Sequence, residues 1–343
     1  MFGCRLRLLS CAFGVISTVN IIFIAKSMHH KSLVVEKSIP SMDWIRNSTL
    51  HAYVRTHTQA ISRPNKTHLI PYKIILNDTF TNPESQKFVA ICAASTSRSR
   101  SWRHMVDSDP FRVLLPSVSA TTTRHDNFQV FLGTDNDDLF WTGEVISQLK
   151  NESLRRWNIM VTVFKYASQP NHIPFNALMR DVYDLGAEYM VRVNDDTTFV
   201  TSGWIQTAMQ VLYSYKPRNV GVVGPWCRPY NLSLHKGNNR ILTHDMVHRT
   251  HLQIFETYYP REFANQFVDD WISMVYGAAR TTHILTWTVL HSLHTGRMVR
   301  YKIIWQSPQR LARVLERDRA ILSMYTQNLT HNHTAAHTVF IDP

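Results

Sequence analysis

An acidic turn follows a hydrophobic segment in the middle of the chain. Residues 188–193 (EYMVRV) have the pattern of a buried strand, and Asn194, Asp195 and Asp196 come directly after it. Carboxylate and amide oxygens are the hard ligands that Mg²⁺ and Mn²⁺ prefer, and such an ion can bridge a diphosphate. Asn and Asp are also favoured turn residues, so a solvated turn is the alternative interpretation.

Polar loops also follow two earlier strand-like segments, at 93–102 (AASTSRSRSW) and 133–138 (GTDNDD). The loops at the ends of strands often carry binding residues, although each of these two taken alone is unremarkable. The polar side chains of these loops include Thr96, Ser97 and Arg98 in the first loop and Asp135 and Asp137 in the second.

A third polar region lies further along the chain, at 242–277. His244, His248 and His251 are spaced i, i+4 and i+7, which would place them on one face of a helix. We interpret these histidines mainly as structural, with a zinc site as the alternative, because no Cys accompanies them and no H-E-x-x-H order is present.

An acidic pair, Asp269-Asp270, stands in the same region and is followed by Trp271. A carboxylate there can act as a general base. The pair can equally be the N-terminal acids of a helix whose Trp belongs to the core, and both interpretations remain open.

These residues need a scaffold, and the pattern from residue 88 onward predicts one. Apolar runs alternate with helical patterns, which indicates an α/β domain with a mostly parallel sheet and helices on both faces. In such sheets ligands bind at the carboxyl ends of the strands. Strands are predicted at 88–93, 128–133, 160–165, 188–193 and 220–224, and helices at 142–157, 174–185 and 308–327.

The N-terminal region predicts entry into the secretory pathway. Residues 8–25 form an uncharged, mostly apolar run at the lower limit for spanning a bilayer, preceded by Arg5 and Arg7. The positive-inside rule favours a cytoplasmic N-terminus and a lumenal body. We favour a type II signal anchor over a cleaved signal peptide, because no small-x-small cleavage site stands out.

Glycosylation signals indicate the same compartment. The chain has seven N-x-S/T sequons, whereas chance would give about three. They lie at Asn47, Asn65, Asn77, Asn151, Asn231, Asn328 and Asn332. Of the four Cys, only Cys92 and Cys227 lie beyond the anchor, and either one disulfide or two free thiols is open.

The formal net charge of +12 is spread along the chain without a dense basic run. Such a charge can serve solubility alone, or it can attract nucleoside diphosphates to a pocket. Dispersed charge and abundant sequons together weigh against nucleic-acid binding.

The segment 174–200 (PFNALMRDVYDLGAEYMVRVNDDTTFV) resembles the nucleotide-sugar half of A-fold glycosyltransferases, with Asn194-Asp195-Asp196 as a variant of their D-x-D-type motif. The resemblance implies a single Rossmann-like domain. It also implies that Asp196 ligates Mn²⁺ or Mg²⁺ and that Asp195 lies beside the ribose or the metal. The other residues that it implies for the nucleotide-sugar site are Thr96, Arg98, Asp135, Asp137, Asn176, Arg180 and Asn194.

The same resemblance assigns roles on the acceptor side. It implies that Asp270 or Asp269 is the catalytic base of an inverting enzyme. It also implies that a His within 286–303 is a third metal ligand, for which we prefer His291 over His294, with an ordinary surface His as the alternative. It also suggests that Trp271, Tyr258 and Tyr259 stack on sugar rings.

We therefore expect a metal-dependent glycosyltransferase of the Golgi membrane. It would move a sugar from a nucleoside-diphosphate donor, with a UDP-sugar as the expected donor, to a hydroxyl of a glycan, protein or lipid. The alternatives are an inactive member of the fold that binds glycans or a partner enzyme, and a polyanion-binding membrane glycoprotein. The predicted boundaries are a cytoplasmic tail at 1–7, an anchor at 8–25, a lumenal stem at 26–85, a catalytic domain at 86–327 (nucleotide-sugar half 86–200, acceptor half 201–327) and an exposed tail at 328–343.

Overall fold

The computed structural model describes residues 87–229, 241–291 and 302–337. All of them fall within one compact unit, Thr79–Pro343. The predicted cytoplasmic tail, anchor and stem lie outside the described residues. Among the helices that are described, none combines the length and the apolar character needed to cross a membrane.

The described residues form one eight-stranded sheet with the order β3-β2-β1-β4-β7-β6-β8-β5. Four of its strand pairs are parallel and three are antiparallel, so the sheet is mixed rather than mostly parallel. The strands are β1 (Val89–Ala94), β2 (Phe128–Asp135), β3 (Val161–Tyr166), β4 (Tyr189–Asn194), β5 (Thr197–Phe199), β6 (Val222–Pro229), β7 (Asp245–His248) and β8 (Thr281–His291).

The first half of the sheet confirms the sequence prediction. Strands β1 to β4 are parallel to one another and begin within one residue of their predicted starts. The helices between them are also confirmed, as α3 (Gly143–Trp157) and α4 (Phe175–Asp184). Gly186, with φ +95°, takes the left-handed backbone just past the end of α4, where glycine is favoured.

The second half departs from the prediction. The histidines at 244–251 do not share a helical face, because β7 covers Asp245–His248 and the short helix α6 (Thr250–Phe255) begins only after it. Burial lowers the pKa of both His248 and His251 to about 4, so each is neutral at pH 7. Their structural interpretation stands, and the described residues bring no metal-binding group together there.

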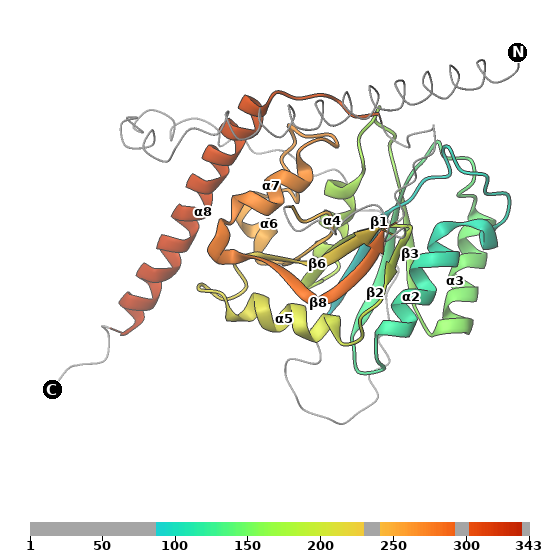
Figure 1. The fold of residues 1–343 in the computed structure, drawn as a ribbon, viewed down its shortest axis with the longest axis horizontal. Helices are drawn as coiled ribbons and strands as arrows, with labels where there is room; N and C mark the ends of the chain where they lie inside the picture. The colour runs from blue at the N-terminus through green and yellow to red at the C-terminus, as the bar shows by residue number, and fades with distance from the viewer. Residues whose placement is uncertain (1–86, 230–240, 292–301, 338–343) are drawn as a thin grey trace, which may run out of the picture. The chain divides into compact units, whose positions relative to one another are not determined.

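Helices cover both faces of the sheet, and the two cores follow the strand alternation. In β1, Val89 and Ile91 point into one core, whereas Ala90 and Cys92 point into the other. The first core packs against α2 (Leu115–Thr121), α3 and α5 (Trp204–Ser214), and the second against α4, α6, α7 (Val268–Val275) and α8 (Pro308–His337). Figure 1 shows α8 running past α6 and α7. It ends at His337, ten residues beyond its predicted end at 327.

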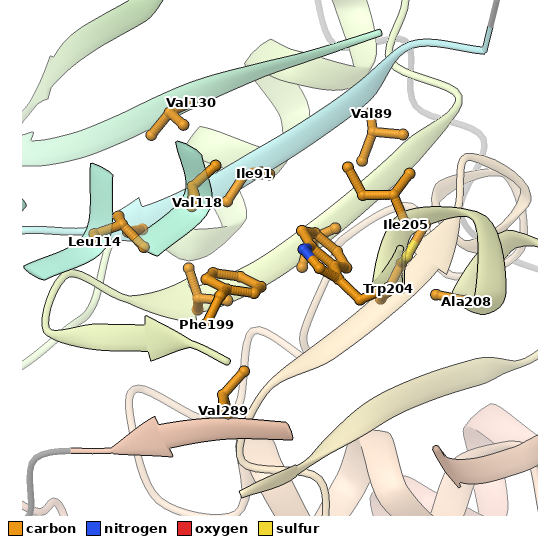
Figure 2. Close-up of a cluster of buried hydrophobic side chains, with 14 of the residues drawn as sticks. Val89, Ile91, Leu114, Val118, Val130, Phe199, Trp204, Ile205, Ala208 and Val289 are labelled. Carbon is orange, nitrogen blue, oxygen red and sulfur yellow. The ribbon is translucent and has the colours of Figure 1, made fainter. Parts of the chain in front are cut away.

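A stack of aromatic rings ties β5 and β8 to α5 in the first core (Figure 2). The Trp204 ring centroid lies 4.7 Å from that of Phe199 and 4.8 Å from that of Trp287. All three side chains are buried. Because β5 follows the acidic turn directly, this stack fixes the position at which the chain leaves that turn.

The two cysteines of the domain are separate free thiols. Cys92 is buried in β1 and Cys227 is buried in β6. Burial raises the pKa of both thiols, so the fold depends on its hydrophobic cores rather than on a disulfide between them.

Gly224 of β6 is expected to tolerate no side chain. A Cβ there would lie 2.4 Å from the carbonyl oxygen of His244 and 2.6 Å from Leu242 Cδ2. We expect Gly224→Ala to lower the free energy of unfolding by at least about 1–3 kcal/mol through overpacking, measured by urea denaturation. Gly143→Ala is the matched control, because nothing lies within 4 Å of its Cβ. Equal stability of the two variants would contradict the close approach.

Candidate active site

The site lies where the strand order changes direction. From β1 the chain proceeds to β2 and β3 on one side of it, and then returns to place β4 on its other side. The crevice at the carboxyl ends of two such strands is the usual ligand site of an open α/β sheet. Here the Ser95 hydroxyl, just after β1, donates a 2.7 Å hydrogen bond to Asp195 Oδ2, just after β4.

Three carboxylates gather at this crevice. Asp195 and Asp196 are 0% and 3% exposed, and Asp109, from the segment before α2, joins them. One oxygen from each lies within 4.8 Å of the other two. Oxygens on opposite sides of an ion at about 2.1 Å are about 4.2 Å apart. Small side-chain shifts would therefore close the three around one Mg²⁺ or Mn²⁺, and carboxylates suit both ions.

One cation already lies among these acids. Arg100 Nη2 is 3.1 Å from Asp109 Oδ2 and 3.3 Å from Asp196 Oδ2. The Arg100 side chain is 11% exposed, and its guanidinium carbon lies 5.9 Å from the ring centroid of Trp102. The acidic group is thus partly neutralised by the protein itself.

The two polar loops after β1 and β2 bind each other. Asp138 accepts hydrogen bonds from the Thr96 hydroxyl at 2.9 Å, from the Ser97 hydroxyl at 2.6 Å and from the Ser97 backbone N–H at 2.7 Å. Arg98 pairs with Asp135, and with Asp137 at 2.5 Å. The sequence candidates in these loops are therefore brought together as one cluster.

Burial and ion pairing shift the pKa values of Asp135 and Arg98 in opposite directions. Burial raises the pKa of Asp135, and Arg98 offsets only part of that increase. Burial by itself would lower the pKa of Arg98, but Asp135 and Asp137 outweigh it and raise that pKa. Because the Arg98 side chain is 36% exposed, its guanidinium is accessible to a ligand in the crevice.

The acidic turn itself is closed by a threonine. The backbone N–H of Asn194 donates to Thr197 Oγ1 at 3.1 Å, and the buried His244 places its Nε2 2.8 Å from the same oxygen. His291, the predicted third metal ligand, pairs with Thr197 in the register of β8 and β5. Its backbone is therefore next to Asp196, whereas its side chain lies outside the described residues.

The acidic pair Asp269-Asp270 lies in the first turn of α7, and Asp269 forms an ion pair with the buried Arg192 of β4. Asp269 Oδ1 accepts a hydrogen bond from Arg192 Nη2 at 2.5 Å. Burial, followed by the charge of Asp269, raises the pKa of Asp270. Burial raises the pKa of the Cys227 thiol, and the smaller contributions include the charges of Asp269, Arg192 and Asp196.

Asn176 and Arg180 are directed to a different segment. The Asn176 side chain exchanges hydrogen bonds with the backbone of Tyr259, at 2.9 Å to its carbonyl and 2.7 Å from its N–H. Arg180 donates to the carbonyl oxygen of Glu256. The two residues hold α4 to the segment 256–259 and are not brought to the three carboxylates.

The aromatic rings that were expected to stack on sugars are buried and cannot contact a ligand. Trp271 and Tyr258 are fully buried, and Tyr259 is 2% exposed. Trp271 Nε1 donates to Asp318 Oδ2 of α8 at 2.9 Å. That interpretation was wrong because these rings form the second core.

A cavity of about 710 Å³ within the described part of the chain does not open on the acidic group. It lies between the segment 254–262 and α8, and it is lined by Arg261, Arg310 and Arg317 among others. We place the active site at the carboxylates rather than at this cavity, because only the former combines convergent acids with the switch in strand order.

Sequence reasoning missed several residues of the site, namely Ser95, Arg100, Asp109, Asp138 and Arg192. Ser95, Arg100 and Asp138 stand within the two loops that the sequence singled out, so the loop position was a usable signal. Asp109 is different, because only the folding of η2 (Met105–Asp107) and the π-helical turn η3 (Pro110–Leu114) carries it back to the acidic turn.

No known family model and no curated protein matches the sequence. Solved structures similar to it include S. aureus TarS residues 1–349, at a TM-score of 0.41 and 12% identity over 60% of this chain and 60% of that one. The same TarS fragment in complex with UDP gives 0.44 and 11% over 75% of each chain. Mannosyltransferase PcManGT from Pyrobaculum calidifontis, in complex with GDP-Man and Mn²⁺, gives 0.41 and 11% over 74% of this chain and 76% of that one.

Glycosyltransferases are therefore among the solved structures that the chain resembles, as its D-x-D-type segment implied. The chain spans only three fifths of the first of them. At TM-scores below 0.5 and identities of 11–12%, the likeness assigns no activity, and the function has to follow from the site.

Proposed function

We propose that the protein is a metal-dependent glycosyltransferase that uses a nucleoside-diphosphate sugar, with a UDP-sugar as the first donor to test. The observation that carries this proposal is the convergence of Asp109, Asp195 and Asp196 at the switch point of the sheet. The adjoining cluster of Arg98 with Asp135 and Asp137 supplies donors and acceptors for a nucleotide.

In this mechanism Asp195 and Asp196 would hold the ion, with Asp109 beside them and His291 as a further candidate. The ion, when bound, supplies positive charge to the leaving diphosphate. Arg98 is positioned to hold phosphate or base, and a guanidinium suits bidentate phosphate contacts.

We assign the catalytic base to Asp270 and a positioning role to Asp269. Asp269 is already engaged by Arg192, which holds that carboxylate in place. Asp270 would take the proton of the acceptor hydroxyl as the hydroxyl oxygen bonds to the anomeric carbon. The bond from that carbon to the diphosphate oxygen would break at the same time, and its electron pair would leave with the nucleoside diphosphate.

The compartment remains part of the proposal. We propose a type II protein of the Golgi membrane with its catalytic domain in the lumen and with a glycan, glycoprotein or glycolipid acceptor. The exposed positions of Asn151 on α3 and Asn328 on α8 are compatible with modification of those two sequons.

Calorimetry with UDP, GDP and their sugars, with and without Mn²⁺, tests the donor site on the full-length protein in detergent. We expect Mn²⁺-dependent binding of one nucleotide. If a folded protein bound none of them, the enzyme proposal would be refuted, and the glycan-binding alternative would take its place.

The two acids of α7 should be separable by pH. A base must be ionised, so the transfer rate of the wild type should rise with pH through the raised pKa of Asp270. Asp270→Asn should lower kcat by about 10²–10⁴-fold and remove that rise. Asp269→Asn is the control, and it should retain the pH dependence whatever its total activity. A retained rise in Asp270→Asn would transfer the role to another group.

A further inference from the structure

The acidic group poses an electrostatic problem when no metal is bound. Asp195 and Asp196 are almost fully buried, and the three carboxylates offer oxygens within 4.8 Å of one another. Like charges at that separation repel strongly where water is excluded. The fold must therefore provide compensating positive charge, protons or hydrogen-bond donors.

Arg100 is placed to provide that charge. One of its terminal nitrogens, Nη2, reaches both Asp109 and Asp196, at 3.1 and 3.3 Å. The loop holds it there, because the backbone N–H of Arg100 donates to the carbonyl of Ser97 at 2.9 Å and its guanidinium packs against Trp102. A guanidinium keeps its charge at any physiological pH.

We propose that Arg100 is a built-in counter-cation of the metal site. When the donor binds, Asp196 must exchange its contact with Arg100 for a contact with the divalent ion. This inference rests on the proposed function. A divalent ion on Asp196 would repel a guanidinium beside it, so Arg100 has to turn away from that carboxylate. A nucleoside diphosphate arriving with the ion offers Arg100 new anionic oxygens.

The consequence is positive coupling between ion and nucleotide. The ion alone must compete with Arg100 for Asp196, whereas the ion with a diphosphate gives Arg100 a replacement partner. Coupling between two ligands is reciprocal, so each should strengthen the binding of the other by the same factor. Free Mn²⁺ should bind weakly, and the site should fill mainly with the ion and the nucleotide together.

The experiment compares Arg100→Gln with the wild type and with Arg103→Gln, a matched loss of one positive charge. Arg103 is exposed, and its backbone N–H, rather than its guanidinium, donates the hydrogen bond to Asp107. Mn²⁺ is titrated into the full-length protein by calorimetry, without and with UDP, and thermal melting is recorded in EDTA and in Mn²⁺.

In the wild type and in Arg103→Gln, UDP should strengthen Mn²⁺ binding by about tenfold or more, within the usual range of coupling. In Arg100→Gln, Mn²⁺ alone should bind at least about fivefold more tightly than in the wild type, and the coupling with UDP should fall below about threefold. The melting temperature of this variant should be lowered in EDTA and restored by Mn²⁺.

Two results would overturn the inference. If the wild type bound Mn²⁺ with UDP and Arg100→Gln matched it in Mn²⁺ affinity and coupling, Arg100 would have no such role while the proposed function stood. If no variant bound Mn²⁺, with or without UDP, both the inference and the metal-dependent function would be wrong.

Discussion

Asp196→Asn should reduce sugar transfer by about 10³-fold or more and abolish Mn²⁺-dependent binding of the nucleotide. The substitution keeps the size of the side chain and removes its charge. A metal ion contributes several kcal/mol to the stabilisation of charge in such a transition state, and each 1.4 kcal/mol corresponds to about tenfold in rate. Because Asp196 is 3% exposed beside Asp195 and Asp109, water cannot readily replace it as a ligand.

The measurement is kcat/KM for transfer together with calorimetry of UDP in the presence of Mn²⁺. Asp184→Asn is the control, because Asp184 is exposed at the end of α4; it should behave as the wild type. The folded state of Asp196→Asn should persist, since removing one of three clustered negative charges relieves repulsion. If folded Asp196→Asn bound Mn²⁺ and UDP as tightly as the wild type does, the ion would have to lie elsewhere.

The parallel half of the sheet was predictable because its signals are local. A strand buried on both faces is a continuous apolar run, as in 88–93, and a helix such as α4 carries its own start and stop residues. The crevice at the ends of β1 and β4 follows from that half alone. The acidic turn, the loop after β1 and the loop after β2 were therefore located correctly before any contact was known.

The second half was not predictable, because its elements are set by distant partners. Strand β7 has four residues, and the spacing of its histidines matches a helix by coincidence. What makes it a strand is pairing with β4 on one side and β6 on the other. The same holds for the aromatic residues near Asp269, whose burial depends on α8 packing over them.

The residues of the site also divide into those that the local sequence indicates and those whose role depends on a distant partner. The sequence indicated that Arg98 and Asp135 carry chemistry, but their mutual ion pair depends on the approach of two loops. Arg192 gave no usable signal, because the buried-strand pattern of 188–193 does not show which acidic residue would accompany an arginine within it. Its position became meaningful only when its register partner proved to be Asp245.

Arg192→Met should be the most destabilising single substitution that we propose, by about 3–5 kcal/mol. Arg192 and Asp245 are 4% and 0% exposed, and Arg192 Nε lies 3.0 Å from Asp245 Oδ2. The same guanidinium donates to Tyr259, to Asp269 and to the carbonyl of Thr243. Although burial opposes its charge, the interactions with Tyr259, Asp269 and Asp245 raise the pKa of Arg192. Methionine would fill much of the volume but leave the Asp245 charge without its cation.

The pH dependence of this loss should identify Asp245 as its cause. Burial already raises the pKa of Asp245 in the wild type, and without Arg192 it should rise further. A carboxyl whose pKa is raised by folding contributes stability at low pH, and that contribution is lost as the pH rises from the unfolded pKa through the folded one. Arg192→Met should therefore be destabilised less at pH 4 than at pH 7, measured by urea denaturation at each pH.

The double variant Arg192→Met with Asp245→Asn separates the buried charge from the lost contacts. Asparagine removes the negative charge and can still accept hydrogen bonds from Tyr258 and Tyr259, which now donate to Asp245 at 2.5 and 2.8 Å. We expect the double variant to be more stable than Arg192→Met, and its free energy of unfolding to change less with pH. The reason is that a polar pair with both charges removed is better tolerated than one unpaired buried charge. A double variant as unstable at pH 7 as Arg192→Met would show instead that packing and the Asp269 contact set the stability. In that case α7, with the proposed catalytic base Asp270, would owe its position to the arginine side chain itself rather than to its charge pair with Asp245.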